Sequence, residues 1–356
     1  MFNFQFRTLV LSALLISTTH AANLDLSPVP LYLGGSVKPN IMFTLDDSGS
    51  MHWEFMPAEN LGWTMFTFPR PNGVYGAGDY TNQVPNFNDN NVHNFFGRSS
   101  NNTLFYNPNN TYLPWSNPDG TSMGDATPTA ALYNPDSPGV GNLDLTSQQT
   151  QWACWFSHTT SLTNVAGDPC SGNHTYWPIT YYIYNGGTVT TRANYTLVQI
   201  GPAATPASFT SPSGIIRTRA EETQNFANWF QYYRSRILLA RAGVGRAFAR
   251  QGTNMRVGFA AINKGSDTID GVSSDSAMIQ GVRDFSGADR TTFFNNLYGH
   301  VMPTSGTPLR NALDDVGKYF ERTDNTGPWS ETPGTSSSAA HLQCRQSYNI
   351  LMTDGY

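Results

Sequence analysis

A short acidic, hydroxyl-rich segment at residues 46–50, with the sequence DDSGS, holds the side chains of this chain that are best suited to chemistry. It directly follows an apolar run at residues 41–45 that is typical of a buried β-strand. Asp46, Ser48 and Ser50 alternate, so a tight turn at the intervening glycine could direct one carboxylate and two hydroxyls to a common point. Oxygen donors without sulfur or imidazole suit Mg²⁺, Mn²⁺ or Ca²⁺ better than zinc or copper. The same residue types also cap helices, so the motif needs partners elsewhere.

Two later segments supply such partners. Thr307 lies in a Ser-Gly-Thr-Pro loop just before a predicted helix, and Asp354 follows closely on an apolar run at residues 348–352. In an open α/β sheet the carboxyl ends of parallel strands meet at one edge, where ligands bind. Each residue alone could be a helix or turn cap. Their order behind the expected elements indicates one shared site.

The elements that would position these residues are predicted from hydrophobic periodicity. A nearly continuous apolar run at residues 255–262 indicates a second buried strand, and the run at 348–352 a third. Apolar residues at steps of three and four predict one long helix at residues 222–251, with its arginines mainly on a solvated face. The alternation of strands and helices indicates an α/β fold with a doubly wound, mostly parallel sheet. We also expect a short edge strand at 277–285, a helix at 289–298 and a helix with Pro308 in its first turn.

Residues 52–220 have a different character, because they are rich in Asn, Tyr, Trp, Pro, Gly and Thr and show no long amphipathic period. We expect a loop- and β-rich insertion, with a hairpin formed by residues 181–184 and 188–197. Its tryptophans could stack on sugars, cover a partner protein, or fill a small core of the insertion. They include Trp115, Trp152, Trp155 and Trp177.

Composition and the N-terminus indicate an exported protein. Charged residues make up 13% of the chain and aromatic residues another 13%, which favours a folded, loop-rich protein outside the cytoplasm. Arg7, a short apolar core and a small-x-small signal predict a signal peptide at residues 1–21, followed by an extended lead-in at residues 22–40. No segment has the length of a transmembrane helix. The net charge of −5 argues against nucleic acid as a partner.

The three cysteines fit a compartment in which disulfides persist. Cys154 and Cys170 would close a short loop with a disulfide worth about 3 kcal/mol in the chain-entropy model. Cys344 is then the odd cysteine. We expect its partner to lie beyond Tyr356, together with the strands that would finish a sheet that is incomplete at the C-terminus.

The motifs at the three positions resemble those of a von Willebrand factor A domain. The match consists of D-x-S-x-S after a strand, G-T-P-L opening a helix and T-D-G after another strand. The resemblance implies a Rossmann-like A domain formed by residues 41–51 and 221–356, truncated at its end. It also implies a metal-ion-dependent adhesion site that holds a divalent cation. The implied metal ligands are Asp46, Ser48, Ser50, Thr307 and Asp354, the last one through water.

Longer segments resemble PilY-type proteins, which are associated with the tip of type IV pili. These segments include YNPNNTYLPW, NWFQYYRSRILLARAGVGRAF, GTPLRNAL and CRQSYNILMTDG. The resemblance implies an exported protein of pilus biogenesis and adhesion, located in the periplasm or outer membrane, at the pilus tip or cell surface, or secreted. Its implied partners are pilus subunits or minor pilins, and a host or surface ligand that presents an acidic group.

Two other functions stay open at this point. A secreted carbohydrate- or protein-binding module would bind through the aromatic insertion and use the A domain as a scaffold. A hydrolytic metal site would need a general base or a positioned nucleophile beside the cation, and the scattered histidines form no H-E-x-x-H motif. Asp47 is the nearest spare acid, and we expect it to support the site. We therefore expect no enzymatic activity.

Overall fold

The computed structural model describes residues 37–56, 66–76, 80–162, 172–201, 205–335, 341 and 345–355. The predicted signal peptide, Cys170 and Cys344 lie outside the described residues. Cys154 is disulfide-bonded, and its pairing with Cys170 stays a prediction. In the described part of the chain, no helix combines the length and the hydrophobicity that crossing a membrane requires.

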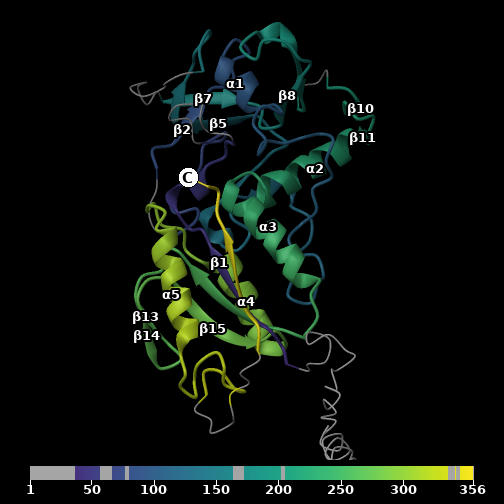
Figure 1. Cartoon of the computed structure of the whole chain (residues 1–356). Helices are drawn as coiled ribbons and strands as arrows, with labels where there is room; N and C mark the ends of the chain where they lie inside the picture. Colours follow the sequence, from purple (N-terminus) through teal and green to yellow (C-terminus); the bar gives the residue numbers. More distant parts are fainter. Residues whose placement is uncertain are drawn as a thin grey trace, which may run out of the picture. The chain divides into compact units, whose positions relative to one another are not determined.

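A sheet forms the centre of the fold (Figure 1). It has four strands, in the order β15-β12-β1-β16. β1 and β12 are almost fully buried, as their continuous apolar sequences require. The three core strands and the edge strand lie where the sequence predicts them. β1 (Asn40–Leu45) is parallel to its neighbours β12 (Arg256–Ala261) and β16 (Ser347–Met352), and β15 (Met278–Asp284) is antiparallel to β12.

The register of the three parallel strands sets where their polar ends meet. Leu45 is paired with Ala261 on one side and with Met352 on the other. The backbone N–H of Asp46 donates to the carbonyl of Met352 at 2.9 Å, and the N–H of Ile262 donates to the carbonyl of Leu45 at 3.1 Å. The residues that follow the three strands therefore lie along one edge of the sheet.

Helices cover both faces of the sheet (Figure 1). On one face, the ring of Phe43 contacts the rings of Phe248 in α3 and Phe293 in α4. On the other face, Met42 packs in a cluster with Val316 of α5. This arrangement fits the predicted α/β class, while the kinship to a von Willebrand factor A domain stays a prediction. The four long helices are α2 (Arg219–Tyr232), α3 (Arg236–Ala249), α4 (Gly287–Gly299) and α5 (Leu309–Glu321).

The prediction of one long helix at residues 222–251 is wrong. The chain forms α2 and α3, with a break at residues 233–235. Ser235 is the N-cap of α3, and its hydroxyl accepts the N–H of Leu238 and lies 2.8 Å from the hydroxyl of Tyr75. A capping serine offers the backbone an alternative to a continuous helix, which apolar periodicity does not reveal.

The predicted solvated face for the arginines of this segment is also wrong for three of them. The side chains of Arg234, Arg236 and Arg241 are buried. Arg234 forms an ion pair with Glu54, Arg236 forms one with Asp354, and Arg241 donates to two backbone carbonyls. The fork of guanidinium donors allows one side chain to satisfy several buried acceptors.

The described part of the insertion consists of short strands, the short helix α1, 3-10 turns and loops. Its predicted hairpin is confirmed in part. β8 (Thr180–Tyr184) pairs with β9 (Tyr195–Gln199), but the second strand begins at Tyr195 and not at residue 188, so the connection at residues 185–194 is longer than expected. The remaining elements of the described residues are η1 (Gly49–His52), β2 (Gln83–Pro85), α1 (Val92–Gly97), η2 (Pro128–Ala130), β3 (Ala131–Leu132), η3 (Pro138–Val140), β4 (Asn142–Leu143), β5 (Gln149–Trp152), β6 (Cys154–Phe156), β7 (Asn173–Tyr176), η4 (Arg192–Asn194), β10 (Ser208–Thr210), β11 (Ile216–Thr218), β13 (Asp267–Ile269) and β14 (Val272–Ser274).

The insertion packs directly against α2. Phe226 and Trp229 of this helix are fully buried, and their rings contact aromatic rings of the insertion. The carboxylate of Glu222, also on α2, accepts hydrogen bonds from the hydroxyls of Tyr106 and Tyr181 at 2.8 Å each. The insertion and the sheet therefore share a core, and residues Lys38–Tyr356 form one compact unit.

A buried carboxylate on α5 anchors the loop between β14 and β15. Asp315 accepts hydrogen bonds from the N–H groups of Asp275 and Ala277 and from the hydroxyl of Ser274. Burial alone would raise the pKa of Asp315, but these hydrogen bonds bring it below the ordinary value. The stabilisation from this group is therefore present above the pKa of the unfolded aspartate, about 3.9. It is lost as the pH falls through the lower pKa of the folded state.

We expect Asp315→Asn to lower the free energy of unfolding by about 1 to 3 kcal/mol at pH 7, because buried donors lose a charged acceptor. The difference between variant and parent should shrink below about pH 4. Urea unfolding at neutral pH and at acidic pH measures both effects. A difference that is the same at every pH would show that the charge of Asp315 does not contribute.

Candidate cation site at the carboxyl edge of the sheet

The segment at residues 46–50, called the acidic turn below, follows β1 directly, and its first four residues are buried. Asp46 is fully buried, and its Oδ1 accepts the N–H of Ser48 at 2.8 Å, while its Oδ2 accepts the hydroxyl of Thr353 at 2.6 Å. The hydroxyl oxygens of Ser48 and Ser50 lie 3.1 Å apart. One carboxylate and three hydroxyls therefore gather where β1 and β16 end.

Asp47 ties the acidic turn to the end of β12. Its Oδ1 accepts the backbone and side-chain N–H groups of Asn263 at 2.8 and 3.1 Å, and its Oδ2 lies 2.7 Å from Nε2 of His300. The side-chain amide of Asn263 also donates to the carbonyl of Gly306 at 2.8 Å. Both oxygens of Asp47 are thus engaged in holding the turn and the neighbouring loop.

The loop that contains Thr307 lies against the acidic turn. The N–H of Gly49 donates to the carbonyl of Ser305 at 2.8 Å. A Cβ at Gly49 would lie 1.8 Å from the hydroxyl oxygen of Tyr80 and 3.3 Å from the backbone of Thr304, so a larger residue here would displace the Tyr80 side chain. Ser305 therefore makes the direct contact with the turn. Thr307 lies two residues further along the same loop and is partly buried.

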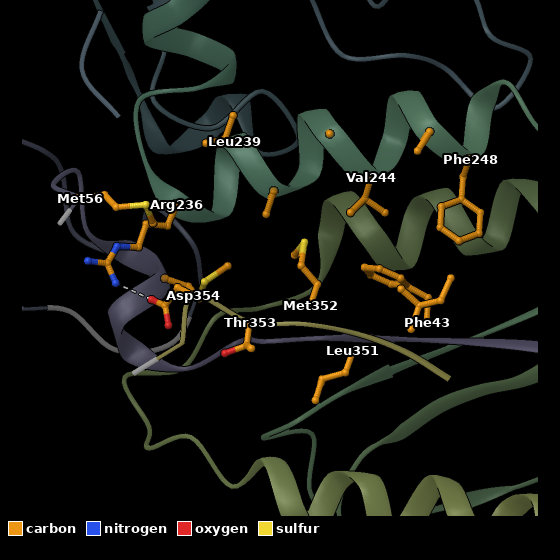
Figure 2. A pocket seen from close by; sticks show the side chains of 15 residues that line it. Phe43, Met56, Arg236, Leu239, Val244, Phe248, Leu351, Met352, Thr353 and Asp354 are labelled. Carbon is orange, nitrogen blue, oxygen red and sulfur yellow. Dashed lines mark hydrogen bonds and ion pairs between the residues drawn. The ribbon is translucent and has the colours of Figure 1, made fainter. Parts of the chain in front are cut away.

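Asp354 is engaged by an arginine. Its Oδ2 lies 2.6 Å from Nη1 of Arg236, and the two side chains are 2% and 1% exposed (Figure 2). Its Oδ1 is buried and has no hydrogen-bond partner among the described residues. The preceding residue, Thr353, is the one that reaches Asp46.

The predicted ligands are thus brought together in part. Asp46, Ser48 and Ser50 form one group and Thr307 lies in the adjoining loop, whereas the carboxylate of Asp354 faces Arg236.

Several residues at this edge are not among the predicted ligands. Thr353 and Asn263 each follow a core strand closely. Because ligands bind at the carboxyl ends of parallel strands, the reasoning that led to Asp46 could have found them as well. His300 and Arg236 reach the site from the ends of helices, and no local pattern in the sequence marks them.

The donor set suits a hard cation. Carboxylate and hydroxyl oxygens are ligands for Mg²⁺, Mn²⁺ and Ca²⁺. Within the described ranges, no three His, Cys, Asp or Glu side chains form a cluster that could hold a metal ion. A cation here would therefore depend on hydroxyl oxygens around Asp46. The partnerless Oδ1 of Asp354, at the end of the adjacent strand, is a further buried acceptor.

The histidine at the end of the acidic turn adds no charge at neutral pH. Burial, followed by the nearby charge of Arg70, lowers the pKa of His52 to about 4. Its Nε2 lies 3.0 Å from the carbonyl oxygen of Met302. A neutral imidazole at this position does not repel a cation.

An apolar groove of about 660 Å³ opens between α3 and β16. Its lining includes Phe43, Val244, Phe248 and Met352, and the ion pair of Arg236 and Asp354 lies at one end of it (Figure 2). The candidate cation site and the groove therefore share Thr353 and Asp354 at the end of β16.

The chain is similar in sequence to curated type IV pilus biogenesis factors. It is 31% identical to the type IV pilus biogenesis factor PilY1 of Pseudomonas aeruginosa strain PAK over 349 residues, which cover 95% of this chain and 25% of that protein. It is 30% identical to PilY1 of P. aeruginosa strain UCBPP-PA14 over 351 residues, which cover 97% of this chain and 25% of that protein. The chain thus spans about a quarter of the length of these relatives. No protein-family model and no solved structure matches it.

Proposed function

The chain is a PilY-type sequence, and from this premise we propose that it serves type IV pilus biogenesis and adhesion by binding a partner through a divalent cation at the acidic turn. The observation that carries the proposal is the convergence of Asp46, Ser48, Ser50 and Thr353 at the ends of β1 and β16. The pilus assignment is supported by relatives that are named type IV pilus biogenesis factors.

The residues at the turn explain how such a site would attract a partner. Asp46, Ser48 and Ser50 would hold the cation, with Thr307 available from the adjoining loop. Asp46 brings one negative charge and the hydroxyls bring none, so the charge of a divalent cation would be only partly neutralised. An acidic group on a pilus subunit, a minor pilin or a surface ligand would then be attracted to the site.

We propose binding in preference to hydrolysis. A hydrolytic site needs a free general base beside the cation. The nearest further acid is Asp47, and its two oxygens are engaged by Asn263 and His300.

We further propose that the protein is exported and acts at the pilus tip or on the cell surface. The disulfide at Cys154 supports an oxidising compartment. Two features support the proposal that residues 41–51 and 221–356 form a von Willebrand factor A-like domain. One is the order of the motifs along the chain, and the other is a mostly parallel sheet with helices on both faces.

The alternative is a glycan- or protein-binding module that uses the aromatic insertion. Trp115 and Trp155 are buried, so they fill the core and are not accessible for stacking. Trp152 is 56% exposed. No observation favours this alternative over the cation site, and the experiment below separates the two.

The test is the capture of purified type IV pili by the full chain, with Mg²⁺ or Mn²⁺ and with a chelator. We expect capture that requires the cation and that is lost in Asp46→Asn, which keeps the size of the side chain and removes its charge. Asp314→Asn is the matched control, because Asp314 lies on the solvent-exposed side of α5. Capture that survives the chelator and is lost in Trp152→Ala instead would transfer the function to the insertion.

A further inference from the structure

We propose that Arg236 lowers the affinity of the site for the cation by holding the carboxylate of Asp354 in an ion pair. This ion pair is called the latch below. The inference rests on the proposed cation site and concerns how the chain regulates it. Asp354 is the one predicted ligand whose carboxylate is engaged by a cationic side chain.

The guanidinium of Arg236 is fixed by the segment that follows the acidic turn. Its Nε and Nη2 donate to the carbonyl oxygen of Phe55 at 3.2 and 2.9 Å, and its Cζ lies 5.1 Å from the centre of the Trp53 ring. The backbone N–H of Arg236 donates to the carbonyl of Trp53 at 3.0 Å. The remaining terminal nitrogen, Nη1, is the one that holds Asp354.

The position of Arg236 at the start of α3 indicates that its positive charge is balanced by the carboxylate of Asp354 and not by the helix. Arg236 is the first residue of α3, directly after the N-cap Ser235. The N-terminal end of a helix carries a partial positive charge, so a cationic side chain there gains nothing from the helix. The buried charge of Arg236 is instead balanced by Asp354.

Asp354 is only half satisfied by this ion pair. One oxygen lies 2.6 Å from Arg236, and the other is buried without a hydrogen-bond partner among the described residues. Buried polar atoms are rarely left unpaired, and an exception calls for an explanation such as strain, a bound water or a bound ion. Oδ1 of Asp354 is thus an open acceptor on the residue that follows Thr353, whose hydroxyl donates to Asp46.

Arg236 and a cation at the turn therefore compete for one carboxylate. While the ion pair is formed, the positive charge of Arg236 neutralises Asp354 and reduces its attraction for a cation. Such coupling is reciprocal: a group that weakens cation binding is itself bound less tightly when the cation is present. Removing the guanidinium should then increase the cation affinity, by about tenfold on the scale typical of coupled sites.

The test is isothermal titration of Mn²⁺ into four forms of the full chain. The Arg236→Gln variant is compared with the parent, and the Arg236→Gln/Asp354→Asn double variant is compared with Asp354→Asn alone. We expect Arg236→Gln to bind Mn²⁺ about tenfold more tightly than the parent. In the Asp354→Asn background the same substitution should change the affinity by less than about threefold. Arg256→Gln is the matched control, because Arg256 is also buried and pairs with Asp284 at the start of β12, the end of the strand opposite the acidic turn. It should leave the affinity unchanged.

The outcomes separate the latch from the cation site itself. Equal or weaker binding by Arg236→Gln, with saturable binding by the parent, would overturn the latch and leave the proposed site standing. A gain of full size in the Asp354→Asn background would show that Arg236 acts through its charge alone, which also overturns the latch. Absence of binding in both folded proteins would overturn the site and the latch together. If Arg236→Gln does not fold, Arg236→Lys keeps the charge but not the fork geometry, and should show part of the gain.

Discussion

Replacing Glu54 by glutamine should lower the free energy of unfolding by about 3 to 5 kcal/mol. Oε1 of Glu54 lies 3.1 Å from Nε of Arg234, and the two side chains are 2% and 0% exposed. The other oxygen accepts the backbone N–H and the hydroxyl of Thr67 at 2.7 Å each. Glutamine would keep the shape but leave the charge of Arg234 buried without a counter-charge, which is the costly way to break a buried ion pair.

Urea unfolding of Glu54→Gln and of the parent measures this difference. Asp314→Asn serves as the control, because the ion pair of Asp314 with Lys318 is largely exposed and exposed pairs add little to stability. Equal urea midpoints for Glu54→Gln and the parent would contradict the view that this pair holds the segment after the acidic turn to the start of α3.

Replacing Trp229 by alanine should lower the free energy of unfolding by about 3 to 5 kcal/mol as well. Trp229 is fully buried on α2 and its ring contacts those of Phe105 and Tyr106 in the insertion. Its indole N–H donates to the carbonyl of Leu104 at 2.9 Å. The truncation removes a large apolar volume and leaves a cavity with an unpaired carbonyl, and both effects destabilise the fold.

The same variant tests whether the insertion and the sheet fold together. Since Trp229 lies between them, we expect one cooperative transition that moves to lower urea concentration in far-UV and near-UV circular dichroism alike. Trp152→Ala is the control, because Trp152 is 56% exposed and should leave the midpoint nearly unchanged. An insertion that unfolds first, while the sheet remains intact, would contradict a shared core.

The sheet and the acidic turn could be predicted because both depend on local features of the sequence. A strand buried on both faces needs a continuous apolar run, and β1 and β12 have one. Polar residues directly after such a run must lie at the carboxyl end of the strand. Parallel register then brings Asp46 next to Thr353, as the paired ends of Leu45 and Met352 show.

The ion pairs could not be predicted in this way. Glu54 and Arg234 are 180 positions apart, and Arg236 and Asp354 are 118 apart. Their pairing depends on how loops and helix ends meet in three dimensions, which no periodicity records. The break at residues 233–235 could not be predicted either, and it places Arg234 between two helices and Arg236 at the start of α3 instead of on the outer face of one long helix.

The most direct test of the cation site is a titration of Mn²⁺ followed by electron paramagnetic resonance, which reports the concentration of the free ion. We expect the full chain to bind one Mn²⁺ saturably, Mg²⁺ to compete for it, and Asp46→Asn to lose the binding while its circular dichroism spectrum stays that of the parent. A folded parent that leaves all of the Mn²⁺ free, or an Asp46→Asn variant that binds as tightly as the parent, would contradict the site proposed at the acidic turn.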